Sequence, residues 1–193
     1  MDYSFQKIEP KWQAKWEEEG IFHAEDFSEK PKFYGLVEFP YPSGAGMHVG
    51  HIKAYSSIEV LSRKRRMQGY NVLFPIGFDA FGLPTENYAI KTNTHPREIT
   101  DKNIAKFSEQ LKRVGFSFDW TRVIDTSRDD YYKWTQWIFL KLFEKGLVFR
   151  NKTLVNYCPS CKVVLSNEDS QGGKCDICHS DVIQLPKDVW YLK

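Results

Sequence analysis

The stretch FPYPSGAGMHVGH, residues 39–51, decides the fold. An apolar run over 33–39 leads into it, and a helical pattern over 49–68 follows it. A second apolar run occupies 71–76. Strand, glycine-containing loop, helix and strand in this order predict a βαβ unit. Such a unit implies a parallel sheet with helices against it and a ligand site at the carboxyl ends of the strands.

Further helices are predicted outside this unit, because each periodic stretch runs into a glycine suited to end a helix. The expected helices begin near Pro10, Val49, Thr100 and Thr126, and the glycines are Gly20, Gly69, Gly115 and Gly146. The stripes expected to be buried are Trp12 and Trp16; Ala54, Ile58 and Leu61; Ile104, Phe107, Leu111 and Val114; and Tyr131, Trp134, Ile138 and Leu142. A third short strand is expected over 153–157.

The loop before the second helix has the composition of a phosphate site. Backbone N–H groups and the positive end of a helix dipole attract phosphate, although neither the dinucleotide fingerprint nor the Walker lysine loop is present. His48 and His51 are three residues apart, so both imidazoles can face one phosphate and donate to oxygens that gain charge in a transition state. Gly50 leaves room for adenine or ribose against the backbone. A lone histidine would favour a structural role, but H-x-G-H after a strand and a glycine loop favours nucleotide binding.

The tetrapeptide His48-Val49-Gly50-His51 resembles the HIGH motif of class I aminoacyl-tRNA synthetases and related nucleotidyltransferases. The wider text, FPYPSG through His51 followed by PIGFDAFGLPTE at 75–86, is similar to the bacterial leucyl-tRNA synthetase pattern. The isoleucyl and valyl relatives share the opening but usually differ in the second segment. Residues 115–122 and 156–161 add to the resemblance, which runs from Ile8 to Lys193.

This resemblance implies the site residues. ATP would lie across Gly44, Gly46, His48, Gly50 and His51, with His48 and His51 as the catalytic pair. Leucine would lie beside Phe39, Tyr41 and Asp79. The position of Asp79 after the second strand suits a carboxylate that pairs with an α-ammonium group, while an ordinary turn aspartate is the alternative. For Phe39 and Tyr41 the alternative is a place in the core.

The resemblance also implies the reaction. The leucine carboxylate attacks the α-phosphorus of ATP, pyrophosphate leaves, and the leucyl group passes to the terminal ribose of tRNA(Leu). Such catalysis relies on positioning and charge stabilisation by histidines, backbone amides and Mg²⁺, so no protein nucleophile is expected.

All four cysteines lie in two C-x-x-C pairs, Cys158 with Cys161 and Cys175 with Cys178. Thirteen intervening residues, including Gly172-Gly173, match the spacing of a four-cysteine zinc ribbon or knuckle. Four thiolates leave no open position for water, so the expected Zn²⁺ is structural. His179 is an alternative fourth ligand in place of Cys178, and unpaired core cysteines are the alternative to any metal site.

Charge and hydropathy restrict the remaining function classes. The 27 basic and 25 acidic residues leave a net charge of +2, which does not by itself indicate a polyanion partner. The basic run over 63–66 suits a helix C-terminus, where cations complement the dipole. No apolar run is long enough to span a bilayer and the N-terminus does not resemble a signal peptide, so a cytoplasmic location and no membrane partner are expected.

The expected organisation is an α/β chain: the N-terminal half of a class I Rossmann-like catalytic domain over 1–152, a zinc module over 153–185, and the start of a connection to an editing domain over 186–193. The family pattern continues much further, and no lysine loop of the K-M-S-K-S type occurs. We therefore expect an aminoacyl-tRNA ligase portion that needs its missing C-terminal portion and is weakly active or inactive alone. Two other readings compete: another H-x-G-H nucleotidyltransferase, and a non-enzymatic zinc-ribbon module that binds RNA.

Overall fold

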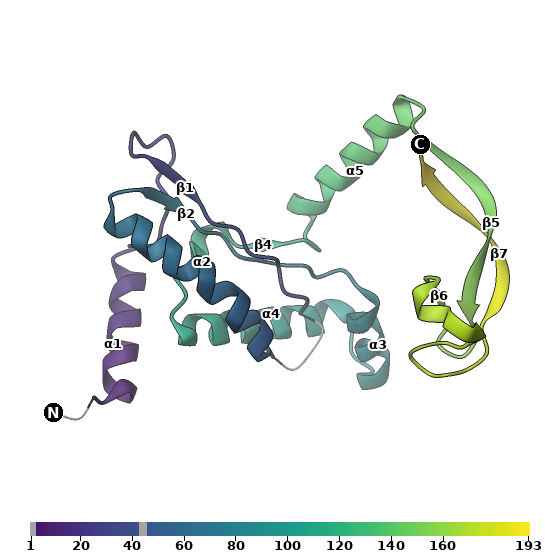
Figure 1. Cartoon of the computed structure of the whole chain (residues 1–193), viewed down its shortest axis with the longest axis horizontal. Coiled ribbons are helices and arrows are strands. Elements are labelled where there is room, and N and C mark those ends of the chain that lie inside the picture. Colours follow the sequence, from purple (N-terminus) through teal and green to yellow (C-terminus); the bar gives the residue numbers. More distant parts are fainter. Residues whose placement is uncertain (1–2, 43–45) are drawn as a thin grey trace. The chain divides into compact units, whose positions relative to one another are not determined.

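The computed structural model describes residues 3–42 and 46–193 and divides the chain into two compact units, Met1–Tyr132 and Lys133–Lys193 (Figure 1). The first unit contains α1 (Phe5–Glu18), β1 (Lys32–Tyr34), α2 (Val49–Met67), β2 (Asn71–Leu73), β3 (Gly77–Phe78), α3 (Leu83–Thr92), α4 (Pro96–Val114), the 3-10 helix η1 (Trp120–Arg122) and β4 (Ile124–Asp125). Helix α5 (Asp129–Glu144) leads into the second unit, which contains β5 (Val148–Cys158), β6 (Val163–Leu165), the 3-10 segment η2 (Glu168–Gly173) and β7 (Ile183–Leu192).

The predicted βαβ unit is present, because β1 and β2 pair in parallel on either side of α2 in the chain. A second parallel pair joins β3 to β4. Strands β1 and β2 are both shorter than the expected strands over 33–39 and 71–76. Pro75, two residues after the end of β2, carries no N–H with which to continue the ladder. Beyond β1 and β2 the two segments stay linked, with Gly35 N–H donating to Leu73 O at 2.9 Å and Asp79 N–H donating to Pro40 O at 3.1 Å.

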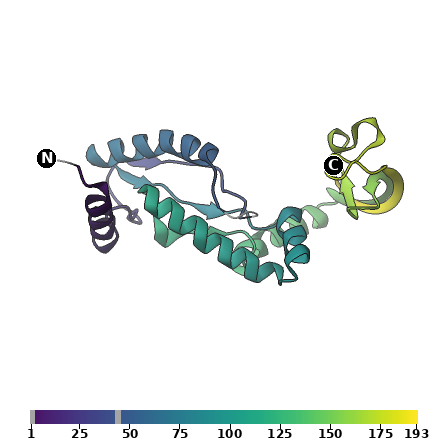
Figure 2. The same ribbon diagram turned by 90° about the horizontal axis from the view of Figure 1, so that it is seen from below.

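The core of the first unit lies between these strands and the two long helices. In Figure 1, α2 and α4 run below the strands, and the view from below in Figure 2 brings both helices forward. The buried cluster comprises Tyr55, Val72, Phe74, Ile76, Leu111, Phe116 and Phe118. Aromatic contacts strengthen it: the rings of Phe74 and Phe118 have centroids 4.4 Å apart. The predicted stripe of α4 is buried at Phe107 and Leu111, but Val114 is 52% exposed.

The expected inward face of α2 is right only at Ile58, which packs against the buried core. Ala54 and Leu61 are exposed, and the helix instead buries Tyr55, Glu59 and Ser62. Glu59 is buried because it accepts hydrogen bonds from both the amide and the hydroxyl of Ser117, each at 2.8 Å. A buried carboxylate satisfied in this way does not appear in a hydrophobic periodicity.

Helix α2 begins at Val49 as expected, but the starts of α1 and α4 differ from the prediction. Helix α1 begins at Phe5 and contains Pro10, which forfeits one backbone hydrogen bond early in the helix. Helix α4 begins at Pro96, with His95 as N-cap accepting from Arg97 N–H at 3.2 Å. Helix α3 was not expected, although Pro near its start and Asn93 in a left-handed conformation at its end are recognised boundary signals.

The four helix-ending glycines are confirmed. Gly20, Gly69, Gly115 and Gly146 have φ values of 59°, 83°, 86° and 65°. At Gly115 this conformation turns the chain so that Phe116 N–H bonds back to Leu111 O, which delivers the following aromatic residues to the core.

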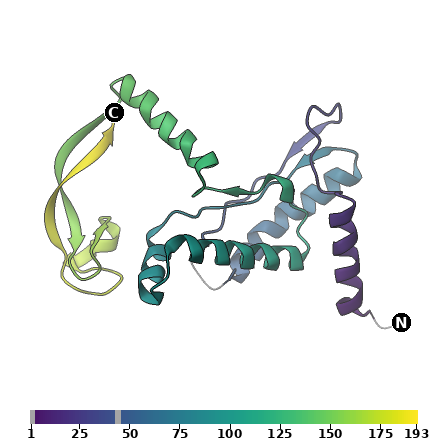
Figure 3. The same cartoon turned by 180° about the vertical axis from the view of Figure 1, so that it is seen from behind.

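The second unit is a three-stranded antiparallel sheet in the order β6-β5-β7. Strands β5 and β7 form a long twisted ribbon (Figure 3), so β5 extends well beyond the expected 153–157. Pro186 lies within β7, which is an edge strand, the place where a proline is tolerated.

The stripe expected to be buried on α5 is wrong. Tyr131, Trp134 and Ile138 are 40%, 59% and 52% exposed. Helix α5 contacts the ribbon through other residues: the rings of Phe139 and Phe143 lie 5.2 Å and 6.0 Å from the ring of Trp190. Because α5 carries apolar residues of its own on all sides, its periodicity does not select one inward face.

Candidate functional site

The N-terminus of α2 is built from the two histidines of the H-x-G-H motif. Their imidazole rings stack with centroids 3.9 Å apart. His48 Nδ1 accepts from Gly50 N–H at 3.1 Å, and His51 Nδ1 accepts from His48 N–H at 3.4 Å. The pair therefore forms a reciprocal capping box. Because each Nδ1 is an acceptor, each neutral ring carries its proton on Nε2, and these N–H groups remain as donors.

Gly50 has a steric reason to be glycine. A Cβ at this position would lie 2.8 Å from both Nδ1 and Cε1 of His48, so any side chain would push the imidazole off the helix end. Burial lowers the pKa of His51 below 6.5, a positive charge on His48 lowers it further, and Glu38 partly opposes the shift. The neutral form of His51 is therefore favoured, and it retains the Nδ1 acceptor that completes the capping box.

The loop before α2 is attached to α4 at both ends. Asn103 Nδ2 donates to Pro42 O at 2.8 Å, and Met47 N–H donates to Gln110 Oε1 at 2.9 Å. Gly46, predicted to contact ATP, lies directly against the Gln110 amide. Gly44 lies outside the described residues.

The three predicted leucine-binding residues are close neighbours along two adjacent segments. Asp79 N–H donates to the carbonyl of Pro40, which stands between Phe39 and Tyr41. The Phe39 ring lies over Gly77, where a Cβ would come within 2.5 Å of Cε2. Tyr41 is 62% exposed and is therefore no core residue.

Asp79 is held from the following strand as well. Thr126 Oγ1 accepts from Ala80 N–H at 2.9 Å and lies 3.5 Å from Asp79 Oδ1. Thr126 N–H in turn donates to Phe78 O at 3.1 Å, which continues the β3–β4 pairing. No spacing pattern in the sequence connects Thr126 with Asp79, so this contact could not be predicted.

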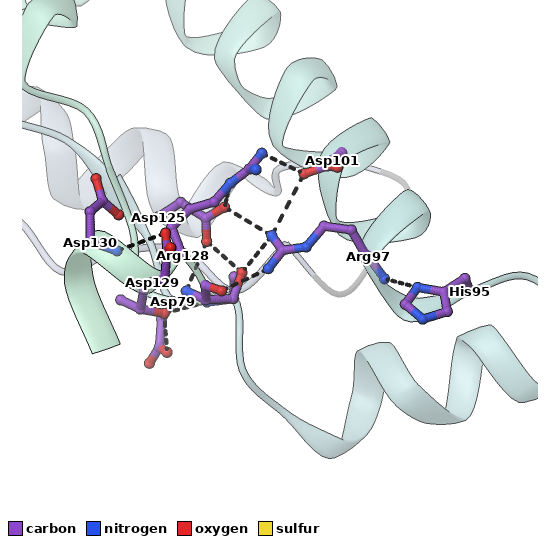
Figure 4. A network of polar contacts seen from close by, with 11 residues as sticks. Asp79, His95, Arg97, Asp101, Asp125, Arg128, Asp129 and Asp130 are labelled. Atoms are coloured by element: carbon purple, nitrogen blue, oxygen red, sulfur yellow. Dashed lines mark hydrogen bonds and ion pairs between the residues drawn. The ribbon is translucent and has the colours of Figure 1, made fainter. Parts of the chain in front are cut away.

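A polar network fixes the turn that carries Thr126 (Figure 4). Arg97 donates to Ser127 O at 2.7 Å and to Ser127 Oγ at 3.0 Å, while Asp125 Oδ1 accepts from Ser127 N–H at 2.9 Å. Arg128 bridges Asp125 and Asp101, each at 3.1 Å. Residues in the first two turns of α4, Arg97 and Asp101, therefore restrain the chain segment that carries Thr126.

Two arginines of the basic run at the end of α2, Arg63 and Arg66, are engaged within the protein. Arg63 donates to Gly115 O at 2.7 Å and stacks 4.7 Å from the Trp16 ring. Arg66 donates to Ser117 Oγ and Ser117 O at 2.6 Å and 2.9 Å. Burial lowers the pKa of Arg66 to about 10, and the charged groups that act on it include Glu59 and Asp119 of the same unit. These arginines organise the core edge, which disfavours the reading of an RNA-binding run.

The four cysteines converge in the second unit. Their Sγ atoms all lie within 4.8 Å of one another, and the Cys158 and Cys178 sulfurs are 3.5 Å apart. Tetrahedral Zn²⁺ with bonds of about 2.3 Å requires sulfurs about 3.8 Å apart, so the cluster suits this ion. His179 is not among the group, so the all-cysteine set is the one the described residues assemble.

Each of the two cysteine pairs is followed by the same kind of backbone turn. The residue after each pair, Lys162 and His179, has φ near 60°, and its N–H donates to the carbonyl of the first cysteine at 2.8 Å. Hydrogen bonds from the hydroxyl and amide of Ser180 lower the pKa of the Cys178 thiol to about 6. A thiolate at this position is the form that binds metal.

Within residues 3–42 and 46–193, no helix has both the length and the apolar character needed to cross a bilayer.

Solved structures resemble the chain over most of its length. A LeuRS–tRNA–LeuAMS ternary complex from Agrobacterium radiobacter superposes with a TM-score of 0.88 at 36% identity, covering 99% of this chain and 25% of that one. A methionyl-tRNA synthetase from Mycobacterium tuberculosis, in complex with methionyl-adenylate, gives a TM-score of 0.67 at 19% identity over 84% of this chain and 32% of that one, which shows the fold alone.

Curated relatives are closer in sequence. Proteins named leucine--tRNA ligase from Alkaliphilus oremlandii and Thermotoga maritima are 56% and 52% identical over 99% and 100% of this chain. The chain spans 24% and 23% of their lengths. The family model described as tRNA synthetases class I (I, L, M and V) matches residues 11–192. With its parallel strands, its H-x-G-H helix start and this match over nearly all its length, the chain belongs to the class I tRNA synthetases.

Proposed function

We propose that the chain binds ATP at the start of α2 and leucine beside Asp79, and that it serves leucine activation and transfer to tRNA(Leu) as about a quarter of a leucine–tRNA ligase. The identity to leucine--tRNA ligases, above 50%, supports leucine as the amino acid.

The observation that carries this proposal is the state of the two histidines. Because His48 and His51 use Nδ1 within the capping box, their Nε2–H groups are the donors left for phosphate oxygens. The backbone N–H groups and dipole of α2 add positive potential at the same place. The capped helix thus offers donors that are oriented before ATP binds, which is the arrangement that stabilises charge in a phosphoryl transition state.

On the leucine side, the Asp79 carboxylate would pair with the α-ammonium group, while Phe39 and Tyr41 flank the bound amino acid. The link from Asp79 N–H to Pro40 O supports this assignment, because it holds the carboxylate beside the segment that carries both aromatic rings. The leucine carboxylate attacks the α-phosphorus and pyrophosphate leaves. Mg²⁺, bound with the ATP phosphates, would supply charge neutralisation.

The four cysteines would hold a structural Zn²⁺ in a module that we assign to 153–185, between a catalytic part over 1–152 and a connection over 186–193. Fully occupied by thiolates, this site leaves no ligand position for catalysis. Reduced cysteines at a metal site also agree with a cytoplasmic location, where thiols are kept reduced.

Leucine-dependent exchange of pyrophosphate into ATP tests the proposal. The zinc-loaded chain is assayed alone and as a chimera in which it replaces the matching quarter of the Thermotoga maritima relative. Isoleucine, valine and methionine are the substrate controls. His48→Asn and His51→Gln retain an acceptor for the helix cap but lose the imidazole Nε2–H, so we expect exchange to fall about 10²–10³-fold while the helix start remains intact.

Asp79→Asn should raise the KM for leucine and leave the KM for ATP near its original value. Exchange in the chimera without leucine dependence would identify another nucleotidyltransferase. Binding of tRNA that survives the histidine changes and is lost with the cysteines would identify a zinc-ribbon RNA module. Either result would overturn the proposed function.

A further inference from the structure

Two amide side chains of α4, Asn103 and Gln110, contact the loop that precedes α2 at its two ends. Asn103 Nδ2 donates to Pro42 O at 2.8 Å, and Gln110 Oε1 accepts from Met47 N–H at 2.9 Å. The two residues are seven positions apart, which is two turns of helix and about 10.5 Å along its axis. They therefore project from the same face of α4.

Helix α4 is a suitable support for these contacts because the core holds it. Phe107 is 2% exposed and Leu111 is fully buried, and Leu111 belongs to the same cluster as Tyr55 of α2. Phe107 lies between the two amides in the sequence and Leu111 directly follows Gln110, so this part of α4 cannot shift without disturbing the core. Side chains on such an anchored element hold their partners more accurately than contacts within a loop.

The two contacts fall at informative places. Pro42 directly follows Tyr41 on the leucine side, and Met47 directly precedes His48, the N-cap of α2. Gly46 leaves space for the second contact, since a Cβ there would lie 2.8 Å from Gln110 Nε2. Side chains of α4 therefore hold both Pro42, next to the leucine-side residues, and Met47, next to the histidine pair.

We propose that Asn103 and Gln110 are positioning residues, which set the geometry of the ATP-binding helix start by holding Pro42 and Met47 from α4. This inference rests on the proposed ATP site. The amides act through the backbone of the loop and need not touch the nucleotide themselves. Loss of either one is expected to misplace His48 relative to the leucine-side residues, since small errors of position at a reacting centre slow catalysis strongly.

The first test is independent of activity. Hydrogen exchange of the Met47 amide is measured by NMR on the 193-residue chain in Gln110→Met, Gln110→Glu and the control Glu109→Gln, an exposed neighbour on α4. Methionine keeps the length of the side chain without the acceptor, whereas glutamate keeps an acceptor oxygen. We expect Met47 to exchange about tenfold faster in Gln110→Met, and within about twofold of the original rate in the other two variants.

The second test uses the chimera. Gln110→Met and Asn103→Asp should each lower kcat/KM for ATP about tenfold in pyrophosphate exchange, Gln110→Glu should restore it, and the thermal unfolding midpoint should stay within a few degrees of the original. Gly46→Ala should accelerate Met47 exchange as Gln110→Met does, because the added methyl group displaces the Gln110 amide.

The outcomes separate this inference from the proposed function. Unchanged Met47 exchange in Gln110→Met would overturn the positioning role, as would faster exchange with unchanged kinetics in an active chimera. A chimera that exchanges pyrophosphate without dependence on His48 or His51 would instead refute the ATP site itself, whatever the Met47 amide does.

Discussion

The imidazoles of His48 and His51 stack 3.9 Å apart, and each uses its Nδ1 to accept from the backbone at the start of α2. The side chains assigned to phosphate binding therefore also complete the helix that presents them. A proton on either Nδ1 would remove an acceptor and open the cap.

Acid should weaken this region first through His51. Its pKa is lowered from 6.5, chiefly by burial, so below about pH 6.5 the unfolded chain binds more protons than the folded one. The free energy of unfolding should fall as pH falls from 6.5 to the lowered pKa, and the His51 contribution should be complete above 6.5. His51→Gln removes the titrating ring but keeps an acceptor, so its stability should depend less on pH.

Urea unfolding between about pH 5 and about pH 8 measures this dependence. His95→Gln, at the N-cap of α4, is the matched control. An equal flattening in both variants, or none in His51→Gln, would contradict the assignment.

Thr126 should matter for leucine through Asp79. Thr126→Val removes the hydroxyl that accepts from Ala80 N–H and lies 3.5 Å from Asp79 Oδ1, while Thr126→Ser retains it. In the chimera we expect the KM for leucine to rise about fivefold in the valine variant and to recover with serine, at constant KM for ATP. A similar rise in both KM values would show that the change acts on the fold as a whole.

Gly77→Ala should disturb Phe39. The added Cβ would lie 2.5 Å from the ring and 2.9 Å from Ile124 O, and the latter is part of the β3–β4 pairing and cannot retreat. We expect about 1–3 kcal/mol of destabilisation and a change in the NMR shifts of the Phe39 ring. Gly69→Ala is the control: it meets no neighbour, so it should cost about 1 kcal/mol through its positive φ and leave Phe39 unchanged. Identical Phe39 spectra in both variants would disprove the contact.

Glu59→Ala should strongly lower the free energy of unfolding. It leaves the Ser117 amide without its acceptor and Arg63 without its carboxylate. We expect a loss of about 3 kcal/mol in the free energy of unfolding, the lower end of the range of about 3–5 kcal/mol for breaking a buried ion pair, because the Arg63 side chain is 35% exposed. The exposed Glu109→Ala should lose under about 0.5 kcal/mol, and a comparable loss in the two variants would be evidence against the network.

Removal of zinc should unfold only the cysteine module. The purified chain should carry one Zn²⁺, and a strong chelator should abolish the NMR signals around Cys158 and Cys175 while those of the first unit persist. Cys161→Ser should lose the metal and His179→Ala should keep it, because the sulfur cluster excludes His179. Retention of zinc in Cys161→Ser with loss in His179→Ala would require a different ligand set.

The sequence was most informative where local chemistry is self-sufficient. Proline and glycine in 39–51 could end a strand and begin a helix without reference to the rest of the chain, and the C-x-x-C spacing specifies a metal cluster on its own. Both predictions depend on neighbouring residues. Helix α2 begins at Val49 as expected and the four cysteines form one cluster, whereas β1 ends earlier than expected, at Tyr34.

Residues whose roles depend on distant partners could not be predicted. Glu59 is buried because Ser117 lies opposite, and Gln110 matters because Met47 is 63 positions earlier in the chain. Hydrophobic periodicity counts side chains on one helix face and contains no information on such pairings. The full extent of the ten-residue β7 could not be predicted either, since Pro186 argues against a strand unless the strand is known to be an edge.

The arginines that end α2 show how little a formal charge count reveals about the field around a protein. Arg63 and Arg66 direct their N–H groups to carbonyl and hydroxyl oxygens, and the Arg65 guanidinium lies 4.9 Å from the Tyr70 ring. A passing polyanion would have to displace these intramolecular partners before it could form its own contacts. These arginines, which in the sequence resemble a polyanion-binding run, therefore stabilise the packing between α2 and the segments beside it. Their substitution should lower the stability of the protein before it changes any affinity for RNA.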